Sequence, residues 1–89
     1  MAATRQFKEG DILFREGDLS EHVLRIAIGQ VEISRLIGTE SVVLGHVAAG
    51  EFLGEMAAVE NRLHSATARG LGRYGGGHHR STVSQLRQP

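Results

Sequence analysis

The hydrophobic positions of this chain form short runs of strand length, and glycine separates one run from the next. Residues 22–28 are mainly apolar, and after Gly29 apolar and polar residues alternate through Ile33. A turn signal at residues 38–41 is followed by a β-branched run at residues 42–47. Alternation at period two with glycine at the turns is typical of antiparallel strands. The pattern predicts an antiparallel meander.

Three further segments extend this prediction. Residues 7–15 indicate a strand that runs into a turn at Gly17, and residues 54–60 are helix formers barely two turns long. Residues 63–68 predict a returning strand with alternate residues on opposite faces. One face carries Leu63, Ser65 and Thr67, and the other carries His64, Ala66 and Ala68. Strands that recur about every ten residues favour a sandwich or barrel over an alternating α/β sheet.

Length and composition limit the class of protein. A chain of 89 residues allows one small domain. Because cysteine is absent, disulfides, thiolate metal sites and thiol nucleophiles are excluded. The apolar runs are far shorter than the roughly 20 residues of a membrane-spanning helix, and the N-terminus lacks a secretory pattern. We therefore expect a cytoplasmic protein without a membrane partner.

The net charge is zero, but the charges are unevenly distributed. All acidic residues lie at or before Glu60, and the charged residues after Glu60 are all arginines. A basic half can indicate nucleic-acid binding. These arginines are scattered, and only Tyr74 among the residues after Glu60 could stack on a base. We therefore expect no nucleic-acid partner.

Residues 50–67 carry the most specific pattern of the chain. They resemble the phosphate-binding cassette of cyclic nucleotide-binding domains of the catabolite activator and protein kinase regulatory subunit type. The matching residues are Gly54, Glu55, Ser65, Ala66 and Thr67, whereas His64 stands where the family has an arginine. The resemblance continues in the correct order through residues 10–18, 28–33 and 44–52, so that it covers residues 5–69.

The resemblance implies a mainly β fold, an antiparallel jelly-roll β-barrel of the cupin-like double-stranded β-helix kind, with a short cassette helix. Family members continue with further strands and a lid helix over the bound base. From Gly70 the chain is rich in glycine and loses its periodicity. We therefore predict a partial domain at residues 5–69 and an irregular tail at residues 70–89, with the C-terminal strands and the lid helix missing. A frame-shifted remnant and a genuine glycine-rich tail both remain open.

The resemblance also implies a ligand site. The candidate residues are Gly54, Glu55, Met56, Ala57, Arg62, His64, Ser65, Ala66 and Thr67. Amide N–H groups at the start of the cassette helix would hold the cyclic phosphate, and Glu55 would accept a hydrogen bond from the ribose 2′-OH. Histidine is mostly neutral at pH 7, so the loss of a charged hydrogen bond could weaken binding about tenfold to a hundredfold. Arg62 is a candidate to compensate.

Three functions are compatible with these patterns. The first is a regulatory module for signal transduction that binds cAMP or cGMP without chemical change, needs no cofactor and controls an unknown effector protein. The second is a degenerate, non-binding β-barrel that serves as a protein-interaction module and self-associates through exposed strand edges. The third is a cupin-like metal-binding protein, but the five histidines form no His-x-His pair. No catalytic motif is visible, so we expect no enzyme.

Overall fold

Eight strands make up the part of the chain that the structure, a computed structural model, describes: residues 2–20, 22–54, 63–71 and 81–87. The strands are β1 (Ala2–Phe7), β2 (Ile12–Phe14), β3 (His22–Ile28), β4 (Gln30–Ile37), β5 (Glu40–Ala48), β6 (Phe52–Leu53), β7 (Thr67–Leu71) and β8 (Ser81–Arg87). The described residues contain no α-helix. They therefore include no helix that is long and apolar enough to cross a membrane. The predicted cassette helix falls mostly on residues 55–60, outside the described residues.

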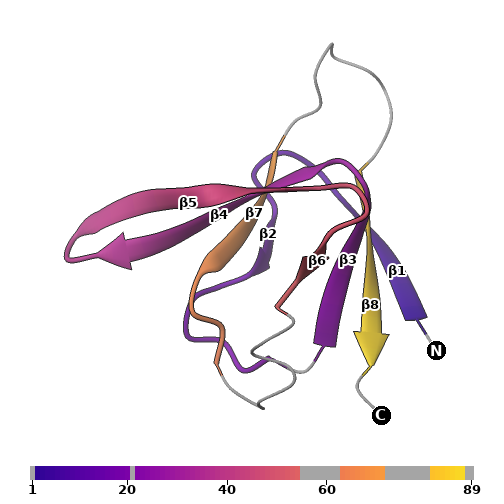
Figure 1. Ribbon diagram of the computed structural model, residues 1–89, viewed down its shortest axis with the longest axis horizontal. Coiled ribbons are helices and arrows are strands. Elements are labelled where there is room, and N and C mark those ends of the chain that lie inside the picture. The colour runs from indigo at the N-terminus through magenta and orange to yellow at the C-terminus, as the bar shows by residue number, and fades with distance from the viewer. Residues whose placement is uncertain (1, 21, 55–62, 72–80, 88–89) are drawn as a thin grey trace.

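The strands form two four-stranded antiparallel sheets (Figure 1). One sheet has the order β1-β8-β3-β6, and the other has the order β2-β7-β4-β5. The predicted mainly β, antiparallel architecture is therefore confirmed. The simple meander is wrong, because β3 and β4 belong to different sheets, and among the eight described strands only β4 and β5 form a hairpin. The chain changes sheets at Gly29, whose φ of 108° favours glycine.

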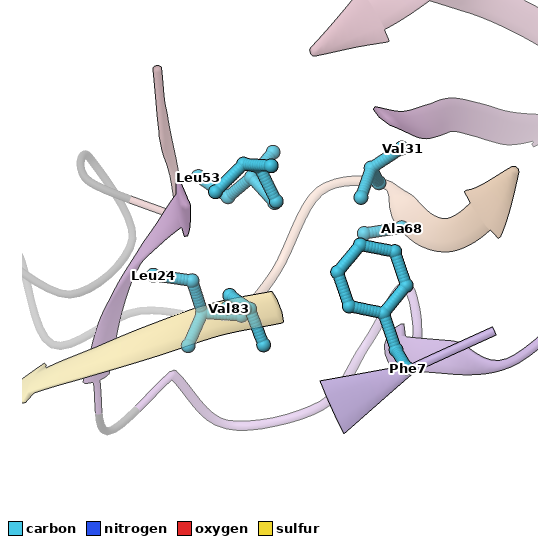
Figure 2. Packing of buried hydrophobic residues seen from close by; sticks show 7 residues of the cluster. Phe7, Leu24, Val31, Leu53, Ala68 and Val83 are labelled. Atoms are coloured by element: carbon cyan, nitrogen blue, oxygen red, sulfur yellow. The ribbon is translucent and has the colours of Figure 1, made fainter. Parts of the chain in front are cut away.

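The hydrophobic core lies between the two sheets, as Figure 2 shows for six labelled side chains. The first sheet contributes Phe7, Leu24, Ile26, Leu53 and Val83, and the second contributes Val31 and Ala68. Leu24 and Ile26 are two residues apart on β3, so the pleat directs both to the same face. Alternation therefore accounts for the burial of these two side chains on one face of β3.

The C-terminal strand corrects the prediction of an irregular tail without further strands. Residues Ser81–Arg87 form β8, which pairs with β1 on one side and β3 on the other. Val83 is fully buried in the core. The segment has few apolar residues, so its pattern is weak, and hydrogen bonds to two neighbouring strands supply the stability that the pattern does not show.

Strand β7 continues through Gly70 to Leu71, beyond the predicted domain end at residue 69. A Cβ added at Gly70 would lie 2.6 Å from the carbonyl oxygen of Lys8 and 2.7 Å from the Phe7 ring. Only glycine allows this approach between β7 and the end of β1. The glycine that appeared to end the domain is thus part of its packing.

Candidate functional site

The two ends of the candidate cassette meet in space. Gly54 follows β6, and residues 63–66 lead into β7. The φ of Gly54 is 71°, and a Cβ at this position would lie only 2.8 Å from Cε1 of His64. Glycine is needed here both for the backbone angle and for the close approach. The structure therefore brings the predicted site residues Gly54 and His64 into contact.

His64 is buried, with 8% of its surface exposed. Its imidazole stacks on the Phe14 ring, with a centroid distance of 3.7 Å and an angle of 9° between the planes. Its backbone is held on both sides, because His64 N–H donates to the Asp18 carbonyl at 2.8 Å and Gly17 N–H donates to the His64 carbonyl at 2.8 Å. The side chain thus has a fixed position at the end of the cassette.

Burial sets the charge of this imidazole. Desolvation lowers the pKa of His64 below its usual value of 6.5, and the nearby Asp18 carboxylate raises it in part. A neutral imidazole has one N–H donor and one acceptor nitrogen. At pH 7 His64 therefore offers no permanent positive charge to an anion.

The residues after His64 alternate between buried and exposed positions. Ala66 is buried and Ser65 is exposed, as the predicted faces require, although the regular strand begins only at Thr67. The Thr67 hydroxyl oxygen accepts a hydrogen bond from Glu16 N–H at 2.9 Å. The other predicted site residues, Glu55, Met56, Ala57 and Arg62, lie outside the described residues.

A small cavity of about 180 Å³ lies beside His64. Its lining includes Phe14, Asp18, His22 and Gln85, so that it combines aromatic, acidic and amide groups. Pockets for small molecules usually span about 300–1,000 Å³. This cavity alone is therefore too small for a nucleotide.

Two neighbours of His64, Phe14 and Asp18, had no role in the sequence-based prediction of the site. Both lie within residues 10–18, which belong to the segment that resembles the family. Their distance of about 50 residues from His64 along the chain hides the contact, because long-range pairing brings the segments together: β2 pairs with β7, and Leu19 forms a bridge with Leu63.

The described residues contain no group of three or more histidine, aspartate or glutamate side chains that could hold a metal ion. His22 and His64 do line one cavity. A metal site usually needs three or four such ligands. The described part of the chain therefore gives no support to the cupin-like metal alternative.

A sequence model of the cyclic nucleotide-binding domain family matches residues 4–73. The chain belongs to this family. The match extends over most of the chain and agrees with the resemblance seen in residues 5–69. A search of curated protein sequences gives no significant match.

Solved structures of this family have the same fold. The half-site-occupied form of the EAL enzyme Bd1971 is 26% identical, with a TM-score of 0.84 over 98% of this chain and 72% of that chain. Its cAMP-bound form is 26% identical, with a TM-score of 0.82 over 96% of this chain and 21% of that chain. The catabolite activator protein of Thermus thermophilus is 24% identical, with a TM-score of 0.82. The match covers 97% of this chain and 38% of the activator chain. The chain thus spans well under half of the last two.

Proposed function

We propose that this chain is a regulatory module that binds cAMP or cGMP, and that the neutral His64 reduces its affinity. The observation that carries the proposal is the contact between Gly54 and His64, which brings together the two ends of the cassette. Membership of the cyclic nucleotide-binding domain family supports it. The likeness to the cAMP-bound and cGMP-bound forms of Bd1971 supports it further.

The chemistry of such a module is binding without reaction. A helix N-terminus offers amide N–H groups and a positive dipole end to a cyclic phosphate. We assign this role to the segment that begins at Gly54, with Glu55 as the acceptor for the ribose hydroxyl. His64 would contribute one neutral N–H donor, in place of the two charged donors of an arginine fork.

A calorimetric titration tests the proposal. The parent chain and a His64→Arg variant are titrated with cAMP and with cGMP at pH 7.5, after circular dichroism has shown that both are folded. Restoring a charged donor should strengthen binding about tenfold to a hundredfold. The matched control is His46→Arg, which adds the same charge at an exposed position of β5. If neither folded protein binds either nucleotide, the proposal fails.

A second titration of the parent at pH 5.5 tests the role of the His64 charge. Because burial lowers the pKa of His64, protonation requires more acid than for a free histidine. Binding that strengthens at pH 5.5 in the parent, and not in His64→Arg, would assign the effect to protonated His64. Equal changes in both proteins would assign it elsewhere.

One observation favours the second function, a non-binding interaction module. His64, which stands where the family has its phosphate-binding arginine, is instead stacked on Phe14. The end of the β4–β5 hairpin also exposes Leu36 and Ile37, which a protein partner could cover. Absence of nucleotide binding in the titrations would leave this module as the better account.

A further inference from the structure

The β4–β5 hairpin extends beyond the part of β4 that β7 supports (Figure 1). The pairing of β4 with β7 ends at Ser34 opposite Thr67, whereas the pairing with β5 continues to Ile37 opposite Glu40. Within the described part of the chain, residues 35–37 therefore have a strand neighbour on one side only. Leu36 and Ile37 are 61% and 59% exposed, so that side-chain packing stabilises this end little.

The Glu16 carboxylate lies along the open side of this segment. Oε1 accepts a hydrogen bond from Leu36 N–H at 3.1 Å, and Oε2 lies 3.8 Å from Nε of Arg35. Alternate N–H groups of a strand point to opposite edges, so the Leu36 N–H needs an acceptor where β7 has already ended. The carboxylate supplies that acceptor. The bond to Leu36 is the stronger contact, because an ion pair with the half-exposed Arg35 is screened by water.

The backbone around Glu16 contacts the cassette at the same time. Glu16 N–H donates to the Thr67 hydroxyl oxygen at 2.9 Å. The next two residues, Gly17 and Asp18, exchange backbone hydrogen bonds with His64. The turn is closed internally, because Arg15 N–H donates to the Asp18 carboxylate and Asp18 N–H donates to the Arg15 carbonyl, both at 3.0 Å. One rigid turn therefore contacts the hairpin through its side chain and the cassette through its backbone.

We propose that Glu16 is a positioning residue that ties the β4–β5 hairpin to residues 63–67 of the cassette, so that the hairpin moves with the cassette. The mechanical link is a property of the described residues alone. Its use as a response to a nucleotide rests on the proposed function. The two parts are therefore tested separately.

The first test uses amide hydrogen exchange of the folded chain without ligand, resolved by residue with NMR. Glu16→Ala should speed exchange at Leu36 and in residues 35–43 by about tenfold, because one hydrogen bond is lost, and should leave β3 and β8 unchanged. Glu16→Gln keeps an acceptor oxygen and should restore most of the protection. The matched control is Glu9→Ala, which removes an exposed acid from another turn.

Thr67→Val distinguishes two cases. Glu16 either links the hairpin to the cassette, or it only supplies a hydrogen-bond acceptor to the Leu36 N–H. The valine removes the acceptor of Glu16 N–H but does not touch the bond to Leu36. A link predicts faster exchange at Leu36 in this variant, and the control Thr4→Val in the other sheet should have no effect. The proposal is overturned if the exchange rate of the Leu36 amide is unchanged in Thr67→Val. It is also overturned if all strands of Glu16→Ala lose protection equally.

The second test adds cAMP at saturation, as established by calorimetry on the same protein. Nucleotide should slow exchange in residues 63–67 and in residues 35–43 of the parent, but only in residues 63–67 of Glu16→Ala. Protection confined to the cassette of the parent would overturn the link. If neither cAMP nor cGMP binds the parent or His64→Arg, the proposed function fails, and the ligand-free test still decides the role of Glu16.

Discussion

His64 shows how one residue couples stability to ligand chemistry. Its ring is buried and stacked on Phe14. The same burial favours the neutral imidazole and removes the charge that would attract a phosphate. Burial therefore favours both the packing of this ring and its neutral form.

The lowered pKa of His64 predicts that acid destabilises the fold. The unfolded chain binds the proton near pH 6.5, whereas the folded chain binds it only at lower pH. The contribution of neutral His64 to stability is therefore complete above about pH 6.5 and is lost as the pH falls toward the folded pKa. The melting temperature should be lower at pH 5.5 than at pH 7.5, as measured by circular dichroism.

The histidine responsible is identified by substitution. His64→Gln removes the titrating group and should flatten the dependence between pH 5.5 and 7.5. His46→Gln, at an exposed position of β5, should keep it. The same slope in His64→Gln and in the parent would show that other groups cause the effect.

Gly54 is the second residue whose role is specific. Gly54→Ala should lower the free energy of unfolding by about 1–3 kcal/mol, since alanine is strained at a φ of 71° and its Cβ would meet the His64 ring. Urea denaturation measures the change. The control Gly45→Ala should have a small effect, because a Cβ there meets nothing within 4 Å.

A double variant divides this cost into its two parts. Adding His64→Ala to Gly54→Ala removes the clash and leaves only the backbone strain. The two changes should therefore be non-additive, with the double variant more stable than their sum implies. Simple additivity would contradict the contact between Gly54 and the His64 ring.

At the level of elements, the strands differ in how strongly their own sequence specifies them. The β4–β5 hairpin has alternating side chains and a turn at Gly38, where φ is 65°. Its prediction is confirmed because its contacts are local. β8 instead depends on partners more than fifty residues away, and the sequence pattern did not reveal it.

Two substitutions in β8 test whether this strand contributes to the hydrophobic core. Val83→Ala should lower the free energy of unfolding by about 2 kcal/mol, because it removes buried methyl groups and leaves a cavity. Ser84→Ala, at the next and partly exposed position, should change stability little. Equal effects of the two substitutions in urea denaturation would show that β8 does not contribute to the core.

For the molecule as a whole, the placement of β8 changes which strand edges are free. β8 lies inside the first sheet, which leaves β1 and β6 at its edges, and β2 and β5 are the edges of the second sheet. Self-association was expected because closing strands were thought to be missing, and it stays a prediction for these four edges. β5 is the longest of them, with Val43 and Leu44 exposed.

The sequence by itself determined the family, the mainly β class of the fold and the positions of several strands. Period-two alternation and positive-φ glycines are local properties, so residues 22–48 and the faces of His64 and Ala66 could be predicted. The correct order of short motifs over residues 5–69 identified the cyclic nucleotide-binding domain, which the family match over residues 4–73 confirms.

Only the tertiary structure decided which strands pair, that Ser81–Arg87 completes a sheet, and what surrounds His64. The stack on Phe14 and the bonds of Glu16 to Leu36 and Thr67 join segments twenty to fifty residues apart. No local pattern encodes such contacts, because they depend on sheet pairing and on the closing of long loops. The loss of charge at His64 likewise follows from burial, which is a property of the folded molecule.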